Sequence, residues 1–90
     1  MKANTNMITK LENNILYTKE YCPFCVRVRQ AMDQLSVEME IRDINDNDDD
    51  RLRLIEGGGK QQVPCLFFKD TKEWMYESDD IIEFIREAVS

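Results

Sequence analysis

The sequence predicts an α/β domain in which a four-stranded mixed sheet lies between helices. Short runs of apolar and β-favouring residues alternate with segments of helical periodicity, in the order strand–helix–strand–helix–strand–strand–helix. Two strands joined through a helix imply a parallel crossover, whereas the short turn near Thr71 implies an antiparallel hairpin. The 90 residues suffice for one domain and its single core.

The first strand is expected over residues 14–18, a short run rich in apolar and β-favouring side chains. Residues 1–12 are polar and lack periodicity, so we expect a flexible lead-in there and one domain over residues 13–90. The first helix follows Cys22, because apolar residues recur at the spacing of one helical face. These residues are Val28, Ala31, Met32 and Leu35. Pro23 suits the first helical turn and places Cys22 at the N-cap.

The middle of the chain combines an amphipathic strand with an acidic segment. Residues 38–44 alternate charged and apolar side chains, which is typical of a strand with one wet face. Residues 45–50 are rich in aspartate, and we expect a solvated loop there, since the spacing of a calcium-binding loop is absent. A short helix is expected over residues 51–55, with the aspartates favourably placed at its start and glycines 57–59 ending it.

The C-terminal part predicts a hairpin and a final helix. Residues 63–68 form a strongly apolar strand candidate, residues 70–72 a turn, and residues 73–76 the returning strand. Ser78 is expected to cap the last helix. The apolar face of this helix consists of Ile81, Ile82, Ile85, Ala88 and Val89.

Composition excludes several functions. The net charge of −6 argues against nucleic-acid binding, although residues 1–35 alone carry more basic than acidic side chains. With no histidine and three cysteines, the chain cannot form a Ser-His-Asp triad, a Cys₂His₂ zinc finger or a complete Cys₄ metal site. No apolar run is long enough for a signal peptide or a membrane span, so we expect a cytoplasmic protein without membrane contact.

The motif that carries chemistry is Cys22-Pro23-Phe24-Cys25, a C-x-x-C that follows a strand and opens a helix. A helix N-terminus stabilises a thiolate, so Cys22 is expected to be the more acidic and more exposed sulfur, with Lys19 adding a positive charge. Cys25 is placed to resolve a mixed disulfide. The alternatives to a redox pair are half of a zinc site, which would need a second cysteine pair, and a structural disulfide, which would need an oxidising compartment.

Lys19-x-x-Cys22-Pro23-Phe24-Cys25, the later Val63-Pro64 and Ser78-Asp79 together resemble the corresponding segments of glutaredoxins, from about Asn14 to Val89. The resemblance implies a thioredoxin-like fold of order β-α-β-α-β-β-α and a dithiol enzyme of the C-P-[aromatic]-C type. Such an enzyme reduces protein disulfides and mixed disulfides with glutathione, using glutathione as the reducing co-substrate and no metal or permanently bound cofactor. Its partners would be glutathione and glutathionylated or disulfide-bonded proteins, and it would be a monomer.

The resemblance also implies roles for residues of the motif. Cys22 would be the nucleophile that becomes glutathionylated, and Cys25 the resolving thiol. Lys19 would pair with the glycyl carboxylate of glutathione, although a solvated surface lysine is the alternative. Phe24 would cover the edge of the site or merely begin the helix.

The remaining glutathione contacts would come from two later segments. Gln62 and Val63 precede Pro64, whose peptide bond would be cis, and the backbone of Val63 would pair with the cysteinyl part of glutathione. The alternative is that Pro64 only begins an edge strand. Ser78 and Asp79 would hold the γ-glutamyl end, or serve as ordinary helix caps.

The chain departs from the family pattern in three places. Tyr76-Glu77 replaces a common Gly-Gly, and the stretch Tyr76-Glu77-Ser78-Asp79-Asp80-Ile81-Ile82 resembles the glutathione site in the N-terminal domain of a glutathione transferase. Gln61-Gln62 replaces a basic residue and a threonine, and Phe24 replaces a tyrosine.

Two alternative functions stay open. One is a redoxin reduced by thioredoxin reductase, and the other is a dimer that binds an iron–sulfur cluster through Cys22 and glutathione, against which Pro23 argues. Cys65 is interpreted as a small core residue, with regulatory oxidation as the alternative.

Overall fold

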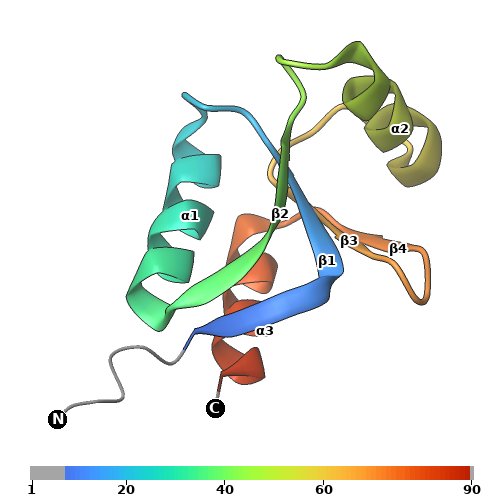
Figure 1. Cartoon of the computed structure of the whole chain (residues 1–90). Helices are drawn as coiled ribbons and strands as arrows, with labels where there is room; N and C mark the ends of the chain where they lie inside the picture. The colour runs from blue at the N-terminus through green and yellow to red at the C-terminus, as the bar shows by residue number, and fades with distance from the viewer. Residues whose placement is uncertain (1–7, 90) are drawn as a thin grey trace, which may run out of the picture.

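A computed structural model describes residues 8–89, which form a four-stranded sheet and three helices (Figure 1). The elements in chain order are β1 (Thr9–Thr18), α1 (Pro23–Leu35), β2 (Val37–Asp43), α2 (Asp48–Gly58), β3 (Cys65–Phe68), β4 (Glu73–Met75) and α3 (Ser78–Ala88). This order of strands and helices confirms the predicted order. No helix in the described part of the chain is both long enough and apolar enough to cross a membrane.

The strands lie in the order β2-β1-β3-β4, so β1 is an interior strand of the sheet. β1 and β2 are parallel, whereas β3 runs antiparallel to both β1 and β4. The register places Leu16 beside Leu66, and it places Tyr17 between Arg42 and Cys65. The mixed sheet expected from the connection lengths is therefore confirmed.

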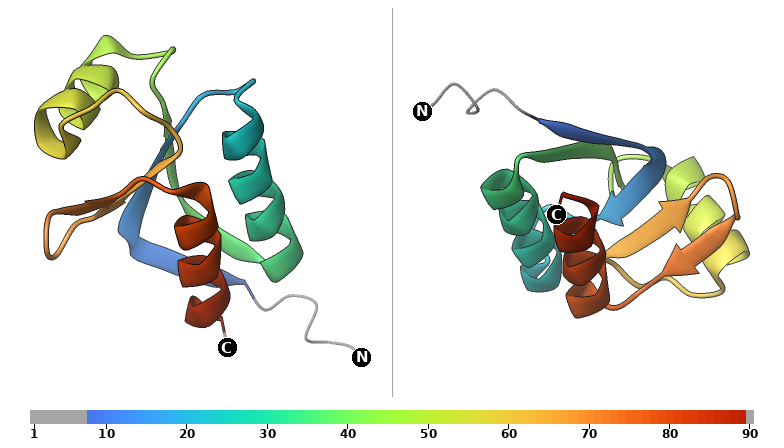
Figure 2. Two further views of the ribbon diagram at one scale, coloured as in Figure 1. Left: turned by 180° about the vertical axis from the view of Figure 1, so that it is seen from behind. Right: turned by 90° about the horizontal axis from the view of Figure 1, so that it is seen from below.

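Two separate cores, and not the single core expected from the chain length, lie on the two faces of the sheet, because successive strand residues point to opposite sides. The α1/α3 core consists of Leu16, Val28, Met32, Val37, Leu66, Ile81 and Ile85. The α2 core consists of Tyr17, Ile44, Leu54 and Cys65. Figure 2 shows α1 and α3 side by side and α2 apart from both.

β1 begins at Thr9 and not at residue 14, so residues 9–12 of the expected lead-in belong to the sheet. Residues 1–7 lie outside the described part of the chain. Thr9 pairs with Val37 of β2, and Leu11 packs against the α1/α3 core. The start of β1 is held in the sheet by a strand that lies far away in the sequence. Its own residues are mostly polar and show no alternating pattern, so the local sequence does not predict a strand there.

α2 begins at Asp48, so the second half of the acidic segment is helical and not a solvated loop. The side-chain oxygen of Asn47 caps the helix by accepting hydrogen bonds from the N–H groups of Asp49 (2.8 Å) and Asp50 (3.4 Å). The helix ends at Gly59, whose φ of 94° lies in the left-handed region that glycine adopts readily. Two of the three glycines expected to stop the helix are therefore part of it.

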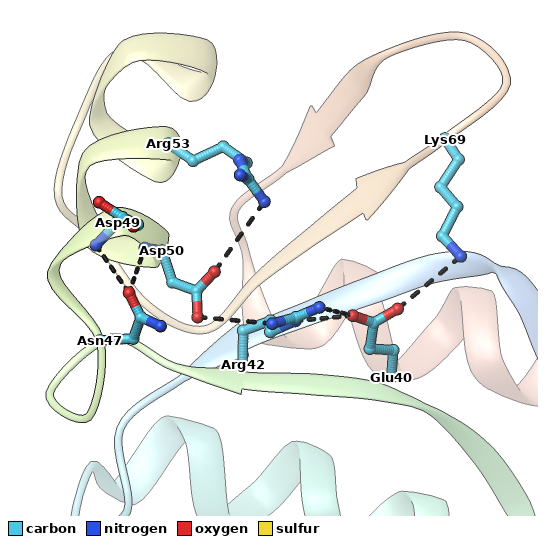
Figure 3. A network of polar contacts seen from close by, with 7 residues as sticks. All are labelled: Glu40, Arg42, Asn47, Asp49, Asp50, Arg53 and Lys69. Carbon is cyan, nitrogen blue, oxygen red and sulfur yellow. Dashed lines mark hydrogen bonds and ion pairs between the residues drawn. The ribbon is translucent and has the colours of Figure 1, made fainter.

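Asp50 is buried between α2 and the sheet, with 5% of its surface exposed. Its carboxylate lies 3.9 Å from a guanidinium nitrogen of Arg42 on β2 and 4.0 Å from one of Arg53 on α2 (Figure 3). Arg42 also pairs with Glu40, whose carboxylate lies 3.8 Å from Nζ of Lys69. These charges connect α2 to β2 beside the α2 core.

α3 begins at Ser78, and Glu77 is its N-cap residue, which corrects the expectation that Ser78 caps the helix. The N-cap side chain makes no capping hydrogen bond. The hydroxyl of Ser78 instead accepts a hydrogen bond of 3.4 Å from Arg27 of α1. The start of α3 is therefore held by a neighbouring helix and not by a local cap.

Candidate active site

Cys22 lies where the loop after β1 enters α1. It is the N-cap residue, with extended backbone angles, and Pro23 begins the helix as predicted. The N–H groups of Phe24 and Cys25 in the first turn interact with the Cys22 sulfur. The sulfur is partly exposed, so it is accessible to a substrate.

The pKa of the Cys22 thiol is lowered from the ordinary value of 9.0. Partial burial opposes ionisation, but the hydrogen bonds from the N–H and thiol of Cys25 and from the N–H of Phe24 outweigh it. The positive charge of Lys19 lowers the pKa further and is the smallest of these contributions. The helix N-terminus, more than the lysine, therefore favours the thiolate.

Cys25 is fully buried one turn further along α1. Burial is the main cause that raises the pKa of the Cys25 thiol. Hydrogen bonds from Thr18 and the Lys19 backbone partly offset it, and the neighbouring Cys22 raises the pKa by smaller amounts. The Lys19 N–H donates to the Cys25 sulfur over 3.5 Å. Cys25 therefore stays protonated under conditions in which Cys22 ionises, as expected for the two sulfurs.

The loop that leads to Cys22 is held by Arg29 of α1. Its guanidinium donates hydrogen bonds to the hydroxyl of Thr18 (2.9 Å) and to the carbonyl oxygens of Lys19 (3.3 Å) and Glu20 (2.8 Å). Arg29 falls outside the apolar face of the helix, and its position in the sequence gives no sign of this role. The loop turns back alongside the helix, and helical periodicity gives no signal of that.

Val63 and Pro64 lie across from Cys22, immediately before β3. The Val63–Pro64 peptide bond is cis, as the family resemblance implied, and Pro64 is buried. The Cys22 thiol donates to the carbonyl oxygen of Val63 over 3.8 Å. The backbone of Val63 is thus adjacent to the reactive sulfur.

Two adjoining cavities flank this contact. One has a volume of about 510 Å³ and is lined by Lys19, Tyr21, Cys22, Asn45, Gln61, Gln62 and Val63. The other, of about 270 Å³, extends to the start of α3 and is lined by Phe24, Arg27, Gln62, Val63, Pro64, Tyr76, Glu77, Ser78 and Asp79. The seven residues predicted to contact glutathione all line one cavity or the other, and Gln62 and Val63 line both.

The segment from residue 14 to residue 72 matches the sequence model of the glutaredoxin family. The chain belongs to this family. The match covers more than half of the chain and includes both cysteines of the motif and the Val63-Pro64 segment. Helix α3 of this glutaredoxin lies beyond it.

Similar proteins include plant and bacterial glutaredoxins. The chloroplastic glutaredoxin-C4 of Oryza sativa subsp. japonica is 27% identical over 86 residues, which cover 82% of this chain and 63% of the relative. The wheat glutaredoxin structure superposes with a TM-score of 0.63 at 25% identity, covering 82% of this chain and 71% of that one. Glutaredoxin 2 of Salmonella typhimurium, solved in complex with glutathione, has a TM-score of 0.68 and 27% identity, covering 83% of this chain and 33% of that one.

These neighbours confirm the thioredoxin-like fold of this glutaredoxin. The chain spans between about half and two thirds of the length of three curated relatives it matches, namely 63%, 50% and 57%.

Arg27 is a second arginine of the site that sequence reasoning missed. One of its nitrogens lies 2.8 Å from the carboxylate of Asp79, and another lies 3.4 Å from the hydroxyl of Ser78. The periodicity of α1 places Arg27 outside the apolar face, but it cannot reveal a partner on α3.

Tyr76 closes the second cavity at a position where the family pattern has glycine. Its hydroxyl donates to the carbonyl oxygen of Lys60 over 3.1 Å, and Nζ of Lys60 lies 4.9 Å from the ring centre. A Cβ atom on Gly58 would overlap the Tyr76 hydroxyl. The glycine in α2 therefore allows the tyrosine to occupy this wall of the site.

Cys65 is fully buried in the α2 core, which agrees with its interpretation as a core residue. Burial raises the pKa of the Cys65 thiol to about 12. Oxidants and disulfides react with thiolates, so this sulfur is inert near neutral pH and regulatory oxidation is not supported.

Proposed function

We propose that this glutaredoxin is a glutathione-dependent thiol–disulfide oxidoreductase that reduces glutathione mixed disulfides and protein disulfides. The observation that carries the proposal is the environment of Cys22. Its partly exposed sulfur has a lowered pKa and lies beside two cavities lined by the predicted glutathione contacts. The other two cysteines are buried and have raised pKa values.

The reaction would begin with the Cys22 thiolate attacking the glutathione sulfur of a mixed disulfide. A bond forms between Cys22 and glutathione, and the substrate's sulfur–sulfur bond breaks, which releases the substrate as a thiolate. The thiolate of a second glutathione then attacks the glutathione sulfur bound to Cys22. This step releases glutathione disulfide and restores the Cys22 thiolate.

Cys25 would act when the substrate is a protein disulfide. Cys22 then forms a mixed disulfide with the substrate. Cys25 attacks the Cys22 sulfur, which forms the Cys22–Cys25 disulfide and releases the second substrate thiolate. Two molecules of glutathione would then reduce this disulfide by successive exchange and leave as glutathione disulfide. The negative charge of Cys22 helps to raise the Cys25 pKa, and this charge disappears when Cys22 enters a disulfide. Cys25 therefore becomes easier to ionise at the step that needs it.

Glutathione would extend through both cavities, with its cysteinyl part at the Val63 backbone. Lys19 in the larger cavity would pair with the glycyl carboxylate, while Ser78 and Asp79 in the smaller one would hold the γ-glutamyl end. Glutathione bound to the Salmonella glutaredoxin 2 supports this choice of ligand. Phe24 and Gln62 would form the edges of the binding groove.

The test is turnover of a small glutathione mixed disulfide, coupled to glutathione reductase and NADPH. Cys22→Ser should abolish turnover, because no other cysteine provides an accessible thiolate. Cys25→Ser should keep the reduction of glutathione mixed disulfides and lose the dithiol reduction of protein disulfides. Cys65→Ala is the matched control, since it removes a cysteine outside the site and should leave turnover unchanged.

Turnover that survives Cys22→Ser would overturn the proposal. Replacing the glutathione system with thioredoxin reductase in the same assay tests the redoxin alternative. Anaerobic incubation with iron, sulfide and glutathione, followed by visible absorption and size-exclusion measurements, tests the cluster-binding dimer. Monomeric state and cytoplasmic location stay predictions.

A further inference from the structure

Arg27 joins the two helices that border the smaller cavity. It extends from the second turn of α1 to the first turn of α3, where it contacts the carboxylate of Asp79 at 2.8 Å and the hydroxyl of Ser78 at 3.4 Å. A guanidinium carries five N–H donors, and these two contacts use only part of them. In the described part of the chain, its other donors have no protein partner.

The lining of this cavity carries charges of both signs. Among the described residues that line it, Arg27 is the cation, and Glu77 and Asp79 are the two anions. A ligand group with a single charge would meet repulsion from one of these partners. An α-amino acid end, which carries both an ammonium and a carboxylate, would satisfy both.

We propose that Arg27 is a specificity-determining residue that binds the α-carboxylate at the γ-glutamyl end of glutathione. The neighbouring Asp79, to which the proposed function already assigns this end, would then face the α-ammonium group. This inference rests on the glutathione-dependent function proposed above. The planar guanidinium matches a carboxylate with two parallel hydrogen bonds. In the free protein, Asp79 accepts from one nitrogen of the guanidinium. The substrate carboxylate would share the N–H donors of the same group.

A purely structural role does not account for the ion pair. The side chains of Arg27 and Asp79 are 51% and 80% exposed, and ion pairs in such positions contribute little to stability. Helices α1 and α3 already pack together through the α1/α3 core. The exposed pair therefore leaves a charged recognition surface at the end of the cavity.

The test compares three mixed disulfides that carry the same fluorescent peptide as leaving group. One contains glutathione, the second contains 4-aminobutanoyl-Cys-Gly without the α-carboxylate, and the third contains glutaryl-Cys-Gly without the α-ammonium group. Stopped-flow fluorescence measures the rate at which reduced protein releases the peptide thiol in a single turnover. Circular dichroism checks that each variant is folded.

We expect the wild-type protein to react about tenfold faster with the glutathione compound than with the analogue lacking the carboxylate. Arg27→Gln should bring this ratio close to one while the preference for the ammonium group remains. Asp79→Asn should bring the ratio for the analogue lacking the ammonium group close to one, while the preference for the carboxylate remains. Arg51→Gln, the same charge change on α2, is the control and should preserve both ratios.

An unchanged carboxylate ratio in Arg27→Gln would overturn the inference. The same loss of rate with all three compounds would also overturn it, because Arg27 would then act on the fold or on Cys22. Faster reaction of the variant would show that the ion pair blocks the cavity instead. If the wild-type protein releases peptide from none of the compounds, the proposed function itself fails.

Discussion

Cys22 and Cys25 carry the same side chain and lie one helical turn apart, yet their pKa values are shifted in opposite directions. Cys22 receives hydrogen bonds from the first turn of α1, and these outweigh its partial burial. Cys25 lies deeper against the sheet, where desolvation dominates. Position along one turn of helix therefore separates a thiol that ionises readily from one that stays protonated.

This difference predicts the pH dependence of alkylation. A lowered pKa keeps Cys22 ionised below the pH at which ordinary thiols protonate, so its reaction with iodoacetamide should rise with pH and level off with a midpoint below 9.0. Mass spectrometry should find the label on Cys22 and not on Cys25 or Cys65. Lys19→Gln should move the midpoint slightly upward, because the lysine is a minor contributor.

A free cysteine in a short peptide is the reference for this measurement. A Cys22 midpoint at or above that of the peptide would contradict the assigned hydrogen bonds. Labelling of Cys25 before Cys22 would contradict the order of the two sulfurs.

At the residue scale, the sequence identified the side chains whose roles follow from a local motif. The C-x-x-C at the start of a helix indicated which sulfur is exposed, and the structure agrees. The sequence did not identify the roles of Arg27 and Arg29, because their partners lie on other segments of the chain. A periodic pattern distinguishes the buried from the exposed face of a helix, but not one exposed arginine from another.

At the scale of elements, α2 shows how glycines can serve packing as well as termination. A Cβ atom on Gly57 would overlap the indole ring of Trp74 on β4, and Gly58 lies against Tyr76 in the same way. Glycine weakens the interior of a helix. Here it allows the helix backbone to lie close to the two aromatic rings, at the expense of helical propensity. The sequence suggested only a helix stop at these positions, because it gives no information on the aromatic residues opposite them.

We therefore expect Gly57→Ala to lower the free energy of unfolding by about 1–3 kcal/mol, the typical cost of overpacking. Propensity alone would give the opposite sign, a gain of about 1 kcal/mol. Urea denaturation followed by circular dichroism measures the change. Glu56→Ala, at the neighbouring exposed position, is the control and should stay within about 0.5 kcal/mol of the original protein. A stabilised Gly57→Ala variant would show that α2 does not pack against Trp74 as described.

On the scale of the whole molecule, the two faces of the sheet are covered unequally. The α1/α3 core joins two helices to three strands, whereas Leu54 is the apolar side chain that α2 contributes to the α2 core. The candidate site lies at the N-terminal ends of α1 and α3, on the better-packed side of the molecule. The α2 side depends more on the ion pairs of Asp50 (Figure 3).

This asymmetry predicts that α2 opens before the rest of the molecule. Backbone amides of α2 should exchange with deuterium faster than those of α1 and α3, because less apolar surface holds the helix in place. Leu54→Ala should raise exchange mainly in α2. Ile85→Ala should instead raise it in α1 and α3 and lower the free energy of unfolding by about 2–5 kcal/mol. Equal protection of the three helices would contradict the unequal packing.

The architecture itself was the most predictable feature, because connection lengths and handedness rules restrict how strands can neighbour one another. The early part of β1 was less predictable, because its polar residues belong to the sheet only by virtue of their pairing with β2. The start of α2 was misplaced for a related reason. Asn47 caps a helix whose first turn is acidic, and an aspartate run suggests solvent exposure until the arginine partner of the buried Asp50 on β2 is known.

The contact between Cys22 and Val63 links the ionisation of the nucleophile to the availability of a docking group. As a thiol, Cys22 donates to the Val63 carbonyl oxygen, and as a thiolate it has no hydrogen to donate. Loss of one proton thus creates the nucleophile and frees a backbone acceptor that an incoming peptide N–H can use. For the proposed reaction, ionisation of the nucleophile and release of the docking group would occur in the same event, and we expect a pH change across the Cys22 pKa to alter KM as well as kcat.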